Sequence, residues 1–377
     1  AIKQQGKWAM VTDGETGEPC DELTDPVFSP DSRHVAYFAQ QGKAWRMISD
    51  GAPGPAFTYL GVGGKMGSEM FREPVFSPDS KRLAYAASRD GKEYVILDEN
   101  ELGPYQHVWG FSFSGDSSRY GFAARLPDDR EVVVIDGKAS TPYKRVSPPA
   151  FSADGKHIAW QTEDRQGALL VRDEKTERLG ISKFRLPVFS PDGTRLAYII
   201  GGKEGQDGLR VDGINAGWAG MKDDAVSNIT FSSDSRRVAY IAEGRLHVAG
   251  EEIDEKLIGW RYTFSPDSRH LAYTAPQPDG SAAVMWNTRA IPVPSFGVYS
   301  LTFSPDSAHL IFAASGAIDK QSYIQVFIDG VPGAKFDELL PFPYDYEQRF
   351  HFDDTHRFHY FGIKDGIIQR VDAAVPD

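Results

Sequence analysis

Cysteine is almost absent from the chain, and long apolar runs are absent altogether. Cys20 is the single cysteine among 377 residues, so an internal disulfide is excluded, and no Cys-x-x-Cys motif exists for zinc or redox chemistry. A membrane-spanning helix needs roughly 18 consecutive apolar residues, and no stretch of the sequence approaches that length. We therefore expect no membrane insertion.

Positive charge is also in short supply. The chain has 41 Lys and Arg residues against 53 Asp and Glu residues, which gives a formal net charge of -12. A surface of that sign repels the phosphate backbone of nucleic acids, and the sequence shows no strong local basic patch. The sequence therefore predicts that nucleic acid is not a partner.

The signatures of several enzyme classes are missing as well. There is no Gly-x-Ser-x-Gly nucleophile motif, no phosphate-binding loop, no His-Glu-x-x-His pair and no complete calcium loop. Three histidines, His351, His356 and His359, cluster near the end of the chain, but their placement around a turn argues against convergence on a metal ion. We expect no catalytic residue, no cofactor and no metal.

What the chain does contain is one phrase repeated along its whole length. The phrase is Phe-Ser-Pro-Asp-Ser with small variations, followed by a basic residue, an aliphatic, a small residue and an aromatic. Its eight copies begin at Phe28, Phe76, Phe113, Phe151, Phe189, Phe231, Phe264 and Phe303, and a degenerate ninth begins at Phe352. The spacing varies from 33 residues between Phe231 and Phe264 to 49 between Phe303 and Phe352. Such a period is typical of the four-stranded blade of a β-propeller.

Each copy predicts a hairpin. The apolar pair before the turn and the aliphatic-small-aromatic run after it are short β-prone segments, and Pro-Asp-Ser or Pro-Asp-Gly between them is turn chemistry. The eight turn aspartates are therefore interpreted as structural. Seven and nine residues after each Phe stand large side chains such as Val35 and Tyr37, and between them a mostly small one such as Ala36. Large residues on one strand face and small ones on the other suit sheets that stack closely.

These patterns predict an all-β fold, a single β-propeller of four-stranded blades that spans residues 1–377. The chain starts and ends inside a repeat, so we expect residues 1–23 and 350–377 to share a composite closing blade. Eight full copies plus that composite predict nine blades. A ring of eight blades with the end strands as a cap is the alternative.

With these elements laid out, the repeat resembles the WD-repeat-like propeller family that includes the Tol-system translocation protein and the propeller domains of prolyl-oligopeptidase-type enzymes. The match extends over essentially the whole chain. It is specific for the fold and not for an activity. The resemblance implies a binding platform that is extracytoplasmic, either periplasmic or secreted.

Candidate ligand-binding residues precede the repeat Phe by three or four positions. On a propeller, the loops that enter the innermost strands surround one mouth of the central channel, and the residue types vary at this slot, which suggests that packing does not dictate them. Trp and Arg are frequent anchors of interfaces. The candidates are Arg72, Trp109, Arg185, Asn228, Trp260, Arg261 and Tyr299.

A second set of candidates lies in one of the two longest connections, between Phe336 and Arg349. It contains Phe342, Tyr344 and Tyr346 among acidic residues, a mixture typical of a partner surface. The sequence thus predicts a non-catalytic propeller that binds a protein or peptide through its loop-bearing face and channel mouth. Two alternatives stay open: a propeller enzyme of the polysaccharide lyase or glycosidase type with a channel site, and a structural module of a larger sensor or kinase polypeptide.

Overall fold

The chain folds almost entirely into antiparallel β-strands. The computed structural model describes residues 1–60, 73–180, 186–201, 207–219, 226–249, 254–257, 261–277, 281–293, 297–318, 321–340 and 350–376. Over these residues there is no helix, and hence none that is long and apolar enough to cross a membrane. The all-β prediction is confirmed.

Each of the eight full repeats forms one sheet, numbered here from sheet 1 to sheet 8. Its strands follow one another in chain order, so that the first strand lies at one edge and the fourth at the other. In sheets 1, 2 and 4 the first strand is split into two short pieces that both pair with the second strand. Sheet 1 comprises β5 (Glu22–Leu23), β6 (Val27–Phe28), β7 (Val35–Gln41), β8 (Ala44–Ser49) and β9 (Ala52–Phe57), and sheet 2 comprises β10 (Tyr59–Leu60), β11 (Val75–Phe76), β12 (Leu83–Arg89), β13 (Lys92–Leu97) and β14 (Asn100–Tyr105). Sheet 3 comprises β15 (His107–Phe113), β16 (Tyr120–Arg125), β17 (Glu131–Ile135) and β18 (Lys138–Ala139), and sheet 4 comprises β19 (Arg145–Val146), β20 (Ala150–Phe151), β21 (Ile158–Asp164), β22 (Gly167–Arg172) and β23 (Lys175–Gly180).

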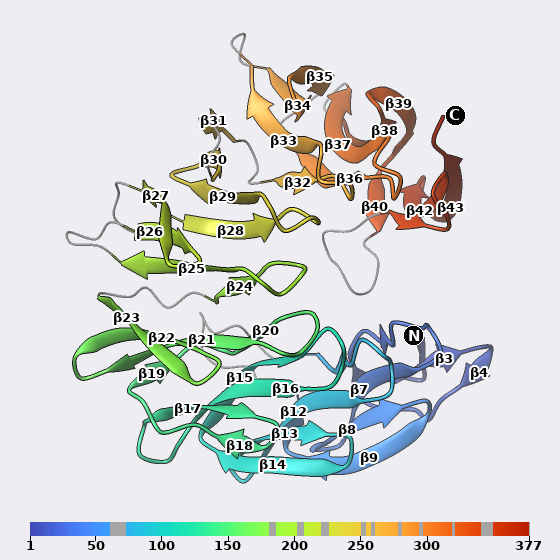
Figure 1. Cartoon of the computed structure of the whole chain (residues 1–377). Helices are drawn as coiled ribbons and strands as arrows, with labels where there is room; N and C mark the ends of the chain where they lie inside the picture. Colours follow the sequence, from blue (N-terminus) through green and yellow to red (C-terminus); the bar gives the residue numbers. More distant parts are fainter. Residues whose placement is uncertain are drawn as a thin grey trace. The chain divides into compact units, whose positions relative to one another are not determined.

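The later repeats follow the same plan (Figure 1). Sheet 5 comprises β24 (Val188–Phe189), β25 (Leu196–Gly201), β26 (Asp207–Val211) and β27 (Ile214–Ala219), and sheet 6 comprises β28 (Val226–Phe231), β29 (Val238–Ala242), β30 (Arg245–Val248) and β31 (Asp254–Lys256). Sheet 7 comprises β32 (Tyr262–Phe264), β33 (Leu271–Pro276), β34 (Ala282–Trp286) and β35 (Arg289–Val293), and sheet 8 comprises β36 (Val298–Phe303), β37 (Leu310–Ile318), β38 (Gln321–Ile328) and β39 (Val331–Phe336).

The two ends of the chain form partial sheets. At the N-terminus β1 (Ile2–Gln4) pairs with β2 (Lys7–Ala9), and β3 (Val11–Thr12) pairs with β4 (Glu15–Thr16). At the C-terminus β40 (Glu338–Leu340) and β41 (His351–Phe352) both pair with β42 (Arg357–Lys364), which pairs with β43 (Ile367–Ala374). We call β40–β43 the final sheet.

The chain divides into two compact units. The first comprises Ala1–Phe189 and Tyr198–Gly201, and the second Ser190–Ala197 and Gly202–Asp377. Sheet 5 contributes residues to both units. The single propeller over residues 1–377 and the composite blade from residues 1–23 and 350–377 stay predictions.

Within each unit, neighbouring sheets pack face to face through the predicted large-and-small pattern. Ala36 and Phe38 of β7 pack against Tyr85 and Ile96 of sheet 2. The residue in the predicted small position is fully buried wherever it is alanine, that is, at Ala36, Ala84, Ala159, Ala197, Ala239 and Ala272. Sheet 8 also packs against the final sheet, through Phe358 and Tyr360, although its small-residue position holds Ile311 instead of alanine.

Asp-Gly pairs recur in the turn between the third and fourth strands, at Asp50-Gly51, Asp136-Gly137, Asp212-Gly213 and Asp329-Gly330. The contacts of one of these aspartates explain why the residue recurs. Asp136 adopts a positive φ of 49°, which suits the tight hairpin, and its carboxylate also reaches back to the second strand. One oxygen accepts the Tyr120 backbone N–H at 3.0 Å, and the other accepts from Arg119 Nε at 2.9 Å. The Asp therefore joins three strands of its sheet.

Replacing Asp136 by Ala removes both hydrogen bonds and leaves the Tyr120 N–H and the Arg119 guanidinium without this acceptor. We expect the free energy of unfolding to fall by about 1–2 kcal/mol relative to a matched control, measured by urea denaturation. The control is Asp90→Ala, because Asp90 has a similar positive φ of 53° but its carboxylate makes no hydrogen bond within the described residues. Equal losses in the two variants would contradict this role of the Asp136 carboxylate.

Candidate functional site

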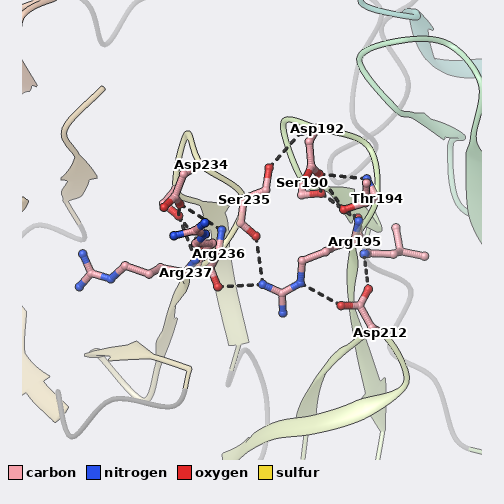
Figure 2. Close-up of polar contacts among 11 residues, drawn as sticks. Ser190, Asp192, Thr194, Arg195, Asp212, Asp234, Ser235, Arg236 and Arg237 are labelled. Carbon is pink, nitrogen blue, oxygen red and sulfur yellow. Dashed lines mark hydrogen bonds and ion pairs between the residues drawn. The ribbon is translucent and has the colours of Figure 1, made fainter. Parts of the chain in front are cut away.

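The repeated turns form a hydrogen-bonded network rather than a set of available carboxylates (Figure 2). In sheet 5 the buried Ser190 hydroxyl donates to Asp192 at 2.6 Å and accepts the Arg195 backbone N–H at 2.9 Å. The same Asp192 oxygen accepts the Thr194 N–H at 3.0 Å. The matching serine donates to the matching aspartate in all eight full repeats, at Ser29, Ser77, Ser114, Ser152, Ser190, Ser232, Ser265 and Ser304.

The network also joins one sheet to the next. The Asp192 backbone N–H donates to Ser235 Oγ at 3.0 Å, and the Arg195 guanidinium donates to the carbonyl oxygens of Ser235 and Arg236 at 3.0 and 2.8 Å (Figure 2). The corresponding Asp-to-Ser bonds are Asp31 to Ser80, Asp79 to Ser117, Asp234 to Ser268 and Asp267 to Ser307. The geometry supports the structural interpretation of these aspartates.

Hydrogen bonding makes these carboxylates more acidic than usual. The Ser190 hydroxyl, followed by the Thr194 backbone N–H, lowers the pKa of Asp192 to about 2. The serine hydroxyl is likewise the main cause of a lowered pKa at Asp31, Asp79, Asp116, Asp154, Asp234, Asp267 and Asp306. A carboxyl whose pKa is lower in the folded state stabilises the fold above its unfolded pKa, about 3.9.

We therefore expect acid sensitivity that originates in the turns. The contribution of Asp192 is fully present above about pH 4 and is lost as the pH falls through the folded pKa of about 2. The double variant Asp192→Asn/Asp234→Asn keeps an acceptor oxygen at each turn but cannot titrate. Its melting temperature should therefore fall less steeply than that of the parent between about pH 4 and pH 2.

The control for this pH series is Asp90→Asn, since the Asp90 carboxylate makes no hydrogen bond within the described residues. Its pH profile should match that of the parent protein. An unchanged slope in the double variant would exclude the turn carboxylates as the origin of the acid sensitivity.

Sequence reasoning missed a second partner of the network. This partner is the basic residue six positions after each Phe, and in sheet 5 the residue at this position, Arg195, contacts three separate groups. Its guanidinium pairs with Asp212 at 2.9 Å and lies 5.6 Å from the ring centroid of Phe231, the repeat Phe of the next sheet. His157 does the same with Asp173 and Phe189. The available signal in the sequence was the joint occurrence of His or Arg at this slot with a later turn aspartate, which is Asp212 for Arg195 and Asp173 for His157.

Three of the four described candidate residues lie on first strands rather than in loops before them, and the fourth, Arg261, directly precedes β32. Trp109, Asn228 and Tyr299 belong to β15, β28 and β36, and the pairing register of each strand shifts just after Trp109, Ser227 and Tyr299. The residue at the shift has a positive φ in each case, 62° at Gly110, 49° at Asn228 and 52° at Ser300. The expectation of entry loops was wrong here because a β-bulge absorbs one extra residue and lets the strand continue.

In the second unit the structure brings three candidate positions onto consecutive sheets. Asn228 is exposed at the bulge of β28, and its carbonyl oxygen accepts a hydrogen bond from the hydroxyl of Tyr262 in sheet 7. The Tyr262 hydroxyl oxygen also lies 3.0 Å from the Ala239 carbonyl oxygen, which competes for the same proton, and burial raises the pKa of Tyr262 above its usual range. Arg261 directly precedes Tyr262, and β32 lies against β36, which carries Tyr299. We call Asn228, Arg261 and Tyr299 the inner-strand row.

Trp109 lies in the first unit and has a packing role. Its ring stacks on His107 at 5.5 Å and packs with Val146 and Trp160 of sheet 4. His107 Nδ1 is held 2.7 Å from Glu93. Six candidates lie outside the described residues: Arg72, Arg185, Trp260, Phe342, Tyr344 and Tyr346.

The terminal histidines are arranged differently from the sequence expectation. His351 lies opposite His359 across β41 and β42, with ring centroids 4.9 Å apart, so the two do converge. His356 points elsewhere, with its Nε2 3.7 Å from Asp306. The expectation overlooked that the residue before the repeat Phe pairs with the small-residue position of the second strand, as Val27 pairs with Ala36.

Comparisons with known proteins show the fold class. No protein-family model matches the chain, and no curated protein matches it. A crystal structure of the eukaryotic initiation factor aligns with 89% of this chain and 97% of that chain, with a TM-score of 0.52 and 15% identity. TolB from Acinetobacter baumannii aligns with 64% of this chain and 61% of that chain, with a TM-score of 0.32 and 18% identity. The initiation-factor structure is a propeller of the WD40 type, and its likeness to this all-β chain supports a β-propeller fold.

Proposed function

We propose that the chain is a non-catalytic β-propeller that binds a protein or peptide partner through the inner-strand row and the loops beside it. The observation that carries the proposal is the bulge in β28 and β36, the strands of Asn228 and Tyr299, at the slot where residue types vary. A bulge places two residues of one strand opposite one residue of its neighbour, bends the strand and redirects side chains. Such a position is suited to a ligand contact.

The chemistry of the row fits a polypeptide. Asn228 provides an amide, Arg261 a guanidinium and Tyr299 a phenol, and Tyr and Arg are enriched at the centres of protein interfaces. The Tyr262 hydroxyl fixes the Asn228 backbone, so the row is preorganised rather than loose. The loop candidates Phe342, Tyr344 and Tyr346 belong to the same proposal, as does the extracytoplasmic location implied by the family resemblance.

Two observations disfavour the enzyme alternative. The turn aspartates, which are the most regular carboxylates of the chain, are all engaged by serine hydroxyls. Their lowered pKa values also make them poor proton donors near neutral pH. A lyase or glycosidase would need a carboxyl group or other acid that is poised to exchange protons.

Peptide selection tests the binding proposal. Peptides enriched from a random display library on the immobilised protein should bind Asn228→Gly and Arg261→Ala at least about tenfold more weakly than the parent, the change expected for an anchor worth about 1.4 kcal/mol. Glycine is chosen at Asn228 because it retains the positive φ. Fluorescence anisotropy gives the affinities.

Arg236→Ala is the matched control for this measurement. Arg236 lies in the same unit, is exposed at the turn edge of sheet 6 and changes the charge by the same amount. It should leave the affinity unchanged. If no peptide is enriched, or if both row variants bind as the parent does, the row is not the binding site.

We further propose that the chain closes into a ring of nine blades, with residues 1–23 and 350–377 in the closing blade. Two partial sheets support it: the final sheet has three successive strand positions, the third being β43, and near the N-terminus β4 pairs with β3 while Cys20 forms a bridge with Trp8 of β2. Face-on class averages from electron microscopy should show nine spokes. Eight spokes would favour the alternative in which the end strands form a cap.

A further inference from the structure

One face of the final sheet carries a compact group of metal-binding residue types. His351, His359 and Asp372 lie opposite one another on β41, β42 and β43, since His351 pairs with His359 and His359 pairs with Asp372. Directly opposed residues of antiparallel strands place their side chains on the same face. Asp353, which follows β41, reaches the same place through its contact with His359.

The ligand atoms of Asp353, His359 and Asp372 lie close enough together to bind one metal ion. His359 Nδ1 lies 3.1 Å from each carboxylate oxygen of Asp353. One ligand atom each of Asp353, His359 and Asp372 lies within 4.8 Å of the other two. His351 lies outside this group of three, but its ring centroid is 4.9 Å from that of His359, so a rotation of its side chain would be needed to bring a ring nitrogen to the same ion. Ligand atoms about 2.0–2.1 Å from a tetrahedral ion are roughly 3.4 Å apart, so small side-chain movements suffice.

The charge of Asp353 and the exposure of the His359 and Asp353 side chains also suit the binding of a cation. The hydrogen bond from His359, aided by nearby positive charge, holds the pKa of Asp353 below its usual range, so this carboxylate is ionised near neutral pH. The His359 side chain is 12% exposed, which restricts its orientation, while Asp353 is 37% exposed and keeps a path for entry. Arg370 pairs with Asp372 at 2.8 Å and is the cation that an arriving ion displaces.

We propose that His351, Asp353, His359 and Asp372 bind one divalent transition ion of the Zn²⁺ type. Two imidazoles and two carboxylates suit Zn²⁺, and a site with four protein ligands is closed, as structural rather than catalytic zinc sites are. The ion links the first, second and third strands of the final sheet. This inference does not depend on the binding proposal for the inner-strand row.

The test uses the whole chain, freed of metal with a chelator and of any affinity tag. Isothermal titration with Zn²⁺ should show one site per chain, and Co²⁺ should give the intense visible bands of tetrahedral coordination. Asp372→Asn and His359→Gln should each weaken Zn²⁺ binding by about 100-fold, because loss of even an outer partner of a metal ligand costs roughly 10–100-fold. His351→Asn should weaken binding similarly and abolish the tetrahedral Co²⁺ spectrum.

His356→Asn is the matched control, because His356 belongs to the same turn but its ring faces Asp306. Its Zn²⁺ affinity should equal that of the parent. Asp372 is 69% exposed, so Asp372→Asn tests the site even if His359→Gln fails to fold. Absence of Zn²⁺ binding by the parent, or equal affinity in the parent and Asp372→Asn, overturns the proposal.

Discussion

Close approach of neighbouring sheets is the constraint on which the rest of the structure depends. In sheets 1, 2 and 4 to 7 the second strand offers an alanine where the next sheet approaches, and these six alanines are fully buried, whereas sheet 8 has the fully buried Ile311 at that position. Gly121 takes the same position in sheet 3, where an added Cβ would lie 2.8 Å from Pro149 Cγ of sheet 4. The facing aromatic residues bury roughly 150–250 Å² each, about 4–6 kcal/mol before the entropy of ordering is subtracted. Most of the cohesion therefore lies between sheets.

The polar edge network makes this packing specific. Ser235 of sheet 6 accepts from the Asp192 backbone N–H of sheet 5, and the Asp234 backbone N–H of sheet 6 donates to Ser268 of sheet 7, so the turn groups of sheet 6 are satisfied only when both neighbouring sheets are in place. The turn serines at the start of each phrase are almost fully buried, and a buried hydroxyl without a partner costs about 1–3 kcal/mol. A shift of one sheet against the next would break several such bonds at once, which favours one alignment over all others.

The sequence predicted those features of the fold that depend on residues close together in the chain. Turn residues, strand periodicity and the large-and-small alternation recur in every copy, so the eight sheets and the faces of Ala36 and Tyr37 could be derived. The bulges at Asn228 and Ser300 could not, since nothing in the residue types near Phe231 or Phe303 separates a bulged strand from a strand preceded by a loop. The contacts of Arg195 were missed for another reason: they join three segments that are distant in sequence and become neighbours only when sheets stack.

The final sheet departs from the packing rule of the others. Its small-residue position holds His359. The turn between its first and second strands is one residue shorter than in the full repeats, because Phe352 pairs with Phe358, six residues later, whereas Phe28 pairs with Val35, seven residues later. Its face toward sheet 8 remains apolar, with Phe358 fully buried, but its opposite face presents imidazoles and carboxylates. This opposite face therefore has an imidazole where sheets 1, 2 and 4 to 7 have a buried alanine. The side chains around His359 are suited to charge interactions or metal coordination, whereas the carboxylates of the repeated turns are engaged by serine hydroxyls.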